Sequence, residues 1–151
     1  MAVKILDDVI RIRIDSTQVV GAFMRLLAEQ AASGETLAPA NPANRAIGTR
    51  SYGADPETVA RFGLAAMAGC AEAGVMPVPK HFPGHGDTDV DSHWDLPLVS
   101  HSRETLDAVD LPPFRRAVLA GAPAIMTAHL AVPALDPTGR PATLSPPILG
   151  L

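Results

Sequence analysis

The chain has 151 residues, of which 47% are hydrophobic and 19% are charged, and its formal net charge is −4. A chain of this length buries one ordinary hydrophobic core, so we expect one folded unit. Because acidic residues outnumber basic ones, the composition argues against nucleic acid as a partner. No apolar run approaches the roughly 18 residues that cross a bilayer, and no secretory signal pattern is present, so we expect no membrane partner.

The only cysteine, Cys70, excludes an internal disulfide bond. A buried thiol in a reducing compartment is the simplest interpretation of a lone cysteine. Together with the missing signal segment, it favours a cytoplasmic location.

The N-terminal part of the chain carries two weak patterns. Ile10, Ile12 and Ile14 alternate with Arg11, Arg13 and Asp15, which predicts a half-exposed strand. Asp15 or Ser16 is then a candidate helix N-cap, and apolar residues at helical spacing lead to Gly34, a natural helix stop. Residues 38–54 are rich in Pro, Asn and Gly and are predicted to form a loop.

Asp55-Pro56-Glu57 marks the start of a helix. Asp is a favoured N-cap, Pro is favoured at the first helical position, and an acidic first turn suits the helix dipole. Gly74 is predicted to end this helix, and residues 75–82, which begin with an apolar run at 75–78, then predict a buried strand. The helix has one apolar stripe, which is formed by Val59, Phe62, Ala66, Met67 and Cys70.

A dense polar segment, residues 80–93, begins at the end of that strand, and we call it the polar loop. Its ionisable residues are Lys80, His81, His85, Asp87, Asp89, Asp91 and His93. Phe82-Pro83-Gly84-His85 predicts a tight turn, because Pro fixes φ and Gly tolerates positive φ. Polar groups at the C-terminal end of a strand are where α/β folds carry their chemistry.

A second helical region is predicted to begin near Ser102, to be interrupted at Pro112-Pro113 and to end at Gly121. Residues 124–129 predict a second buried strand, which again ends in a histidine, His129.

The C-terminal part is predicted to be a loop over residues 133–143, rich in Pro, Gly and Asp. Ser145-Pro146 then predicts the start of a further helix, with Ser at the N-cap and Pro at the first helical position.

The order of strand, loop and helix predicts βαβ units around a parallel sheet. A complete (β/α)₈ barrel needs roughly 200–250 residues, more than this chain has. We therefore expect an α/β fold class, as a partial or shortened (β/α)₈ TIM barrel with parallel strands.

The polar loop admits three chemical interpretations. Its histidines and aspartates could ligate a metal ion, but His81 and His85 are separated by a Pro-Gly turn and do not share a helix face. Asp91 and His93, two residues apart, could form a proton-transfer pair in which the carboxylate orients the imidazole. A purely structural loop, with Asp residues capping turns, remains the third interpretation.

Glycoside hydrolase family 3 has a signature that residues 80–88 resemble, Lys-His-Phe-Pro-Gly-His-Gly-Asp-Thr, followed by Asp91-Ser92-His93. The motif is long and highly specific, and within the family it is similar to the β-N-acetylglucosaminidase branch that acts in cell-wall recycling. Residues 47–56, 125–129 and 141–145 also match. The resemblance extends over residues 41–151 and is thin before them.

The resemblance implies a (β/α)₈ barrel domain and a retaining β-N-acetylhexosaminidase. In this branch a histidine paired with an aspartate is the general acid/base, and these roles fall on His93 and Asp91. The residues that hold the substrate fall on Arg50, Lys80 and His81. The implied reaction releases terminal β-linked N-acetylglucosamine from cell-wall-derived saccharides through a covalent glycosyl-enzyme, with no metal or cofactor.

Two departures from the family pattern limit this expectation. The family nucleophile is an aspartate on a later strand, so we expect no nucleophile in this chain, and Asp136 is not in the right place for that role. The family strand before the Asn-Pro loop is missing, because Leu37-Ala38-Pro39 leads almost directly into Asn41-Pro42. We therefore separate a poorly matched segment, residues 1–37, from a barrel segment, residues 38–151.

Three functions follow from these observations. The first is a β-N-acetylglucosaminidase with water or phosphate as acceptor; the second is a catalytically incomplete fragment that binds sugar or is inactive. The third, a metal-dependent hydrolase, is disfavoured by the resemblance. An incomplete barrel exposes strand edges and apolar faces, so we also expect self-association.

Overall fold

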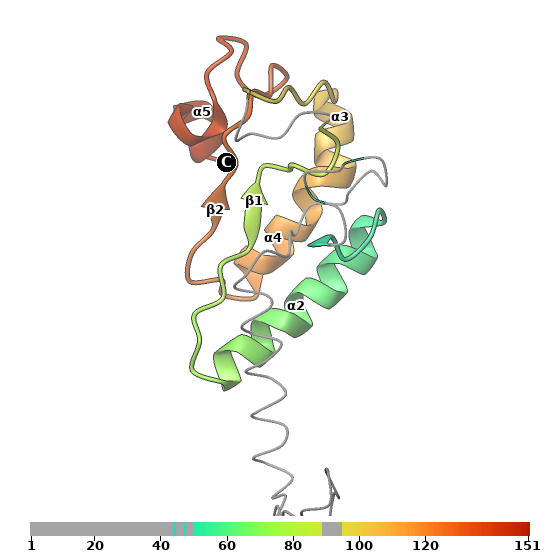
Figure 1. Cartoon of the computed structure of the whole chain (residues 1–151), viewed down its shortest axis with the longest axis vertical. Coiled ribbons are helices and arrows are strands. Elements are labelled where there is room, and N and C mark those ends of the chain that lie inside the picture. The colour runs from blue at the N-terminus through green and yellow to red at the C-terminus, as the bar shows by residue number, and fades with distance from the viewer. Residues whose placement is uncertain (1–43, 45–46, 48–49, 89–94) are drawn as a thin grey trace, which may run out of the picture.

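The computed structural model describes residues 44, 47, 50–88 and 95–151. The strand expected at residues 10–14 and the helix expected after it lie outside these residues. Figure 1 shows a short pair of strands, with two helices, α2 and α4, to one side of the pair and the C-terminal helix α5 beyond its second strand.

Helix α2 spans Pro56–Glu72 and begins where the sequence predicts. Asp55 is its N-cap, and its Oδ2 accepts a hydrogen bond from the amide of Thr58 at 2.8 Å. Cys70 is buried, as expected of a structural thiol. Phe62, also in the predicted apolar stripe, is 47% exposed and stacks on Tyr52.

Strands β1 (Lys80–Phe82) and β2 (Met126–Thr127) pair in parallel, which confirms the predicted βαβ unit. Both strands are shorter than predicted, and the prediction that they are buried is wrong, because β1 is half-buried and Met126 of β2 is 46% exposed. Pro77 and Pro79 precede β1, and because a proline has no amide hydrogen, regular pairing cannot extend back through them. The carbonyl of Pro79 still accepts a hydrogen bond from the amide of Met126 at 3.0 Å.

The connection between the strands is one continuous helical segment. It consists of α3 (Arg103–Thr105), the π-helical turn η2 (Leu106–Asp110) and α4 (Leu111–Leu119). The start near Ser102 is confirmed, since the Ser102 hydroxyl accepts a hydrogen bond from the Thr105 amide.

The interruption predicted at Pro112-Pro113 is wrong. The π-helical turn lies directly before these prolines, and the amide of Leu111 donates to the carbonyl of Leu106, five residues back. A regular α-helix would need amide donors that proline lacks, whereas a wider turn ahead of the prolines removes that requirement. The helix therefore passes through both prolines without a break.

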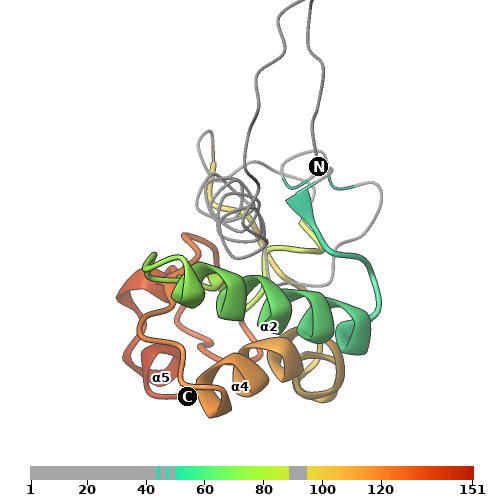
Figure 2. The same ribbon diagram turned by 90° about the horizontal axis from the view of Figure 1, so that it is seen from below.

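The core has two clusters that meet at one aromatic ring. Val59 of α2 packs with Phe114 and Ala117 of α4, where the two helices lie side by side (Figure 2). A second cluster joins η2, α4, α5 and the segment after β2, and Phe82 of β1 packs against both clusters. Its members are Val99, Leu106, Leu111, Ala128, Leu130, Val132, Ala142 and Ile148.

The C-terminal part contains a short 3₁₀ turn, η3 (Ala142–Leu144), and helix α5 (Pro146–Leu149). Ser145 is the N-cap of α5, which confirms the predicted helix start. The described residues thus form an α/β unit with parallel strands, as expected, built on two strands. No helix among the described residues is both long and apolar enough to cross a membrane.

Candidate active site

Lys80 and His81 lie in β1, at the edge of the strand pair from which the polar loop continues. Both side chains are half-buried. Burial lowers the pKa of Lys80, and the positive charge of Arg50 lowers it further. Arg50 thus acts electrostatically on Lys80, although these two predicted substrate-holding residues are 30 positions apart in the sequence.

Arg50 is exposed, and two of its nitrogen atoms donate hydrogen bonds to a carbonyl three residues earlier in the chain. Its backbone amide donates to the carbonyl of Ile47 at 3.1 Å, and its side-chain Nε donates to the same carbonyl at 3.3 Å. This double contact fixes the base of the side chain. A guanidinium held in this way is a donor for hydroxyl or carboxylate oxygens of a ligand.

The first part of the polar loop, residues 83–88, is buried except for Asp87, and we call it the loop root. The Nδ1 atom of His85 lies 2.7 Å from the Thr88 hydroxyl oxygen. The ring of His85 also meets the ring of His81 edge to face, with the centroids 5.9 Å apart. The loop root is thus in direct contact with a residue of the predicted substrate site.

The side chain of Asn44 is hydrogen-bonded to the backbone of the loop root. Its side-chain amide donates to the carbonyls of His85 and Gly86 at 2.8 and 3.0 Å, while its Oδ1 accepts from the amide of Ile47 at 3.1 Å. Asn44 is only 3% exposed, so these contacts satisfy an amide that has left water. The same side chain therefore joins the loop root to the segment that carries Arg50.

His101 lies between two carboxylates. Its Nδ1 is 2.7 Å from Oδ2 of Asp110, and its Nε2 is 2.8 Å from Oδ2 of Asp87. Burial pulls the pKa of His101 down, but the hydrogen bonds and charges of the two carboxylates outweigh burial and raise it. Burial raises the pKa of Asp110, against the opposing hydrogen bond from His101.

The predicted acid/base pair, Asp91 and His93, lies outside the described residues, which resume at Asp95. Its assignment therefore stays a prediction. His129, at the end of the second predicted strand, is exposed, and its Nδ1 lies 2.8 Å from the Thr143 hydroxyl oxygen. Among the described residues, no three His, Cys, Asp or Glu side chains are grouped as metal ligands.

Sequence analysis missed three residues that organise this region: Asn44, His101 and Asp110. The sequence contains one indication that Asp110 has a structural role. It lies four residues after Leu106 and four before Phe114, so it interrupts an apolar helical stripe, where a carboxylate needs a partner. The contacts of Asn44 and His101 carry no comparable pattern, because they join segments up to 44 residues apart.

Asp136, which was not expected to act as a nucleophile, has a structural role. It is 2% exposed, and its carboxylate accepts hydrogen bonds from the Ser145 hydroxyl at 2.6 Å and from the Thr138 amide at 3.0 Å. The hydrogen bonds from Ser145 and Thr138 lower its pKa. Its oxygens are thus used to join the loop before η3 to the start of α5.

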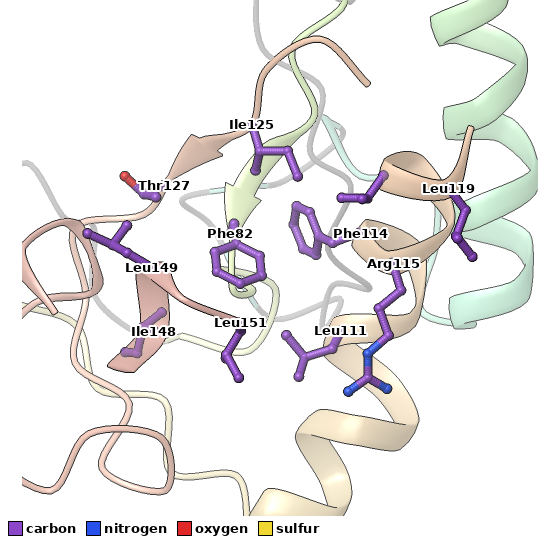
Figure 3. Close-up of a pocket in the computed structure, with 11 residues that line it drawn as sticks. Phe82, Leu111, Phe114, Arg115, Leu119, Ile125, Thr127, Ile148, Leu149 and Leu151 are labelled. Atoms are coloured by element: carbon purple, nitrogen blue, oxygen red, sulfur yellow. The ribbon is translucent and has the colours of Figure 1, made fainter. Parts of the chain in front are cut away.

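A separate cavity of about 580 Å³ lies between α4 and α5 (Figure 3). Phe82 and Phe114 face it from the strand and from α4, and most of the remaining lining is aliphatic. Among the described residues that line it, the polar side chains are Arg115 and Thr127, and neither Arg50, Lys80 nor His81 belongs to this lining. A sugar needs more hydrogen-bonding groups than this, so the cavity is an apolar groove, distinct from the candidate site.

Comparison with known families identifies the chain. Residues 36–151 match the family model described as the glycosyl hydrolase family 3 N-terminal domain. The chain belongs to glycosyl hydrolase family 3. The resemblance carried by the polar loop is thereby confirmed.

Among family 3 relatives, β-hexosaminidase A of Pseudoalteromonas piscicida is 45% identical over 116 residues, which cover 70% of this chain and 19% of that protein. The β-hexosaminidase of Alkalilimnicola ehrlichii is 43% identical over 102 residues, covering 68% of this chain and 29% of that protein. The chain thus spans less than a third of either relative.

Two solved structures are similar to this family 3 chain throughout most of its length. The family 3 β-N-acetylglucosaminidase of Paenibacillus sp. is 45% identical with a TM-score of 0.74, covering 89% of this chain and 27% of that one. NagZ of Neisseria gonorrhoeae, solved in complex with N-trifluoroacetyl-D-glucosamine, is 36% identical with a TM-score of 0.72. That comparison covers 86% of this chain and 40% of NagZ.

Proposed function

We propose that this chain carries the substrate-holding and proton-transfer part of a retaining β-N-acetylglucosaminidase. The observation that carries the proposal is that Lys80 and His81 lie together in β1, directly before the polar loop, with Lys80 under the electrostatic influence of Arg50, in a chain that belongs to family 3. Polar residues at this end of parallel strands are the usual chemical groups of a (β/α)₈ barrel. The relatives named as β-hexosaminidases and β-N-acetylglucosaminidases support the substrate class.

In this proposal the three residues hold the sugar that is released. The guanidinium of Arg50 and the ammonium of Lys80 donate hydrogen bonds to its hydroxyl oxygens, and the His81 ring contributes a further polar contact. The lowered pKa of Lys80 reflects burial, and a hydroxyl bound there would replace the water that the ammonium has lost. The substrate is an N-acetylglucosamine-containing saccharide derived from cell wall, handled in the cytoplasm.

His93 and Asp91 are proposed as the proton-transfer pair. In the first step His93 gives its proton to the leaving oxygen as the glycosidic bond breaks and the anomeric carbon bonds to a carboxylate nucleophile. In the second step His93 takes a proton from water, whose oxygen replaces that carboxylate at the anomeric carbon. Asp91 orients the imidazole and stabilises its charged form. The nucleophile is not assigned to any residue of this chain.

A histidine in place of a carboxylic acid also permits phosphate as the acceptor in the second step. A neutral imidazole does not repel an incoming anion, whereas a carboxylate does. The two acceptors give different products, free N-acetylglucosamine and its 1-phosphate. Product analysis with and without inorganic phosphate distinguishes them.

The decisive test compares the chain with its His93→Ala variant on two N-acetyl-β-glucosaminides, one with a nitrophenyl and one with an alkyl leaving group. Loss of a general acid lowers the rate by about 10²- to 10⁴-fold, and it matters most for the poor alkyl leaving group. We expect the variant to lose more activity on the alkyl glycoside. Equal losses on both substrates would contradict the acid role of His93.

Azide provides the matching control for the second step. Because azide attacks the glycosyl-enzyme without needing a proton acceptor, it is expected to restore nitrophenyl release by His93→Ala and to leave a glycosyl azide of retained configuration. An Arg61→Gln variant, changed at an exposed position on α2, serves as the control that keeps full activity.

A second candidate function is sugar binding without turnover. It concerns the chain by itself, in which sugar-holding residues are proposed but no nucleophile is assigned. This candidate predicts saturable binding of N-acetylglucosamine by calorimetry, weakened by Lys80→Met, in a chain that releases no nitrophenol. Turnover by the unmodified chain rejects it.

A further inference from the structure

Outside the proposed catalytic pair, His101 makes a polar bridge between two segments of the chain. Asp110 belongs to η2 and its side chain is 1% exposed, whereas Asp87 belongs to the loop root and its side chain is 41% exposed. The two ring nitrogens of His101 lie 2.7 and 2.8 Å from these carboxylates. A neutral imidazole has one N–H, so two such contacts require a second proton on the ring or on a carboxyl group.

Asp110 also leaves no room for a side chain at Gly84 of the loop root. Gly84 has a φ of +150°, and a Cβ built on it would lie 2.9 Å from Oδ1 of Asp110. The buried carboxylate thus faces the loop root with Oδ1 beside Gly84 and has Oδ2 within hydrogen-bond distance of His101. Asp110 is the last residue of the π-helical turn η2.

The loop root in turn contacts the candidate substrate site. Asp87 is flanked by Gly86, whose carbonyl Asn44 holds, and by Thr88, whose hydroxyl contacts the ring of His85. That ring packs edge to face on His81. A continuous set of contacts therefore runs from His101 through the loop root to His81.

We propose that His101 is a positioning residue that, as an imidazolium between Asp110 and Asp87, fixes the loop root against η2 and thereby sets the placement of His85 and His81. The inference rests on the proposed function only in giving His81 a substrate-holding role.

Histidine suits this position because its two N–H groups point in opposite directions and reach two carboxylates at once. The charges that act on its ring are those of Asp110 from η2 and Asp87 from the loop root. On the same helical segment Arg103 and Arg115 are bound to Asp107, which keeps their charges engaged away from His101. Removal of one ring proton then leaves one of the two contacts without its donor.

The test follows the imidazole nitrogens by NMR through a pH titration of the whole chain. It compares the unmodified chain with His101→Gln and Asp87→Asn, and with Glu57→Gln as the control. Glu57 forms an exposed ion pair with Arg116 on the α2–α4 surface. Glu57→Gln therefore removes one negative charge, as Asp87→Asn does, but at a position outside the loop root.

We expect both nitrogens of His101 to carry protons at neutral pH and to titrate with a midpoint above ~6.5. Asp87→Asn should lower that midpoint, and Glu57→Gln should leave it unchanged. The ring signals of His81 and His85 should move in the same pH range, and this movement should be absent in His101→Gln. A neutral His101 ring at neutral pH, or unchanged His81 and His85 signals in His101→Gln, overturns the inference.

Two features keep the test decisive. Asp87→Asn changes a side chain that is 41% exposed, so it supplies the result even where His101→Gln does not fold. The titration requires no turnover, so a chain that shows these shifts but no hydrolysis refutes the proposed activity and supports the role of His101. A chain that hydrolyses the glycoside without these shifts supports the proposed activity and refutes the role of His101.

Discussion

The carboxylate of Asp110 lies directly against the backbone of Gly84, where a Cβ would come within 2.9 Å of Oδ1. Glycine is therefore needed at position 84 for two reasons. Its φ is positive, and the carboxylate of Asp110 occupies the space that a Cβ would need. Asp110 is the last residue of the π-helical turn η2, two positions before Pro112-Pro113. It thus connects the helical segment with the loop root through its contact with His101 and its place beside Gly84.

Gly84→Ala is expected to destabilise the chain by about 2 kcal/mol or more. The added methyl group collides with a buried carboxylate, and overpacking of this kind costs about 1–3 kcal/mol before backbone strain is counted. Urea unfolding measures the change. Gly139→Ala is the control, because Gly139 also has positive φ but open space around it; equal losses in the two variants would contradict the steric argument.

Asn44→Ala is expected to lower stability by about 1–3 kcal/mol, because it leaves the buried carbonyls of His85 and Gly86 without the donor seen at 2.8 and 3.0 Å. Thermal unfolding measures the loss. Thr143→Val removes an exposed hydroxyl contact with His129 and should change stability by less than about 0.5 kcal/mol. An Asn44→Ala variant as stable as this control would show that Asn44 does not hold the loop root.

Stability is expected to fall as pH rises above neutrality. The folded-state pKa of His101 is raised, so its contribution is complete below the unfolded value of ~6.5 and is lost as pH rises through the folded value. The raised pKa of Asp110 acts in the same direction at lower pH. Urea unfolding across the neutral and alkaline range should give a steeper loss for the unmodified chain than for His101→Gln; parallel curves would contradict this assignment.

In the acidic range the opposite sign applies to Asp136. Its pKa is lowered by Ser145 and Thr138, so its contribution is present above ~3.9 and is lost as pH falls through the folded value. The Asp136→Asn variant should therefore unfold with a shallower acid dependence. Circular dichroism during acid titration measures this, and an unchanged slope would count against the role of Asp136.

Ser145→Ala is expected to cost about 1–2 kcal/mol, because the hydroxyl both caps α5 and donates to buried Asp136 at 2.6 Å. Ser102→Ala, at the exposed N-cap of α3, is the matched control and should cost less. Comparison of the two midpoints in urea separates the cap from the buried hydrogen bond. Equal costs would mean that the contact with Asp136 contributes nothing.

The isolated chain is expected to self-associate through the apolar groove between α4 and α5, with a second copy as the occupant. Leu119 at its rim is 87% exposed, and Leu149 and Leu151 beside it are more than half exposed. Sedimentation at micromolar concentration should detect dimers that Leu119→Glu reduces. Met76→Glu, at an exposed apolar residue outside the groove, should leave them intact, and a monomer throughout would contradict the expectation.

Local chemistry determined where the helices begin. Asp55-Pro56 and Ser145-Pro146 each combine a side-chain cap with a proline whose missing amide costs nothing at that position, so the prediction needed no tertiary information. The parallel pairing of two strands around a helix also followed from element order, and the motif from Lys80 to His93 was specific enough to indicate the family.

Tertiary structure decided the features that depend on distant contacts. The strands are short because prolines limit their pairing, and the helix continues through Pro112-Pro113 because a π turn precedes them. His101 meets Asp87 and Asp110 across 14 and 9 residues of chain, contacts that arise only when the helix packs against the loop root. Local propensity is a property of neighbouring residues, whereas such a bridge depends on the packing of whole elements, which no short pattern encodes.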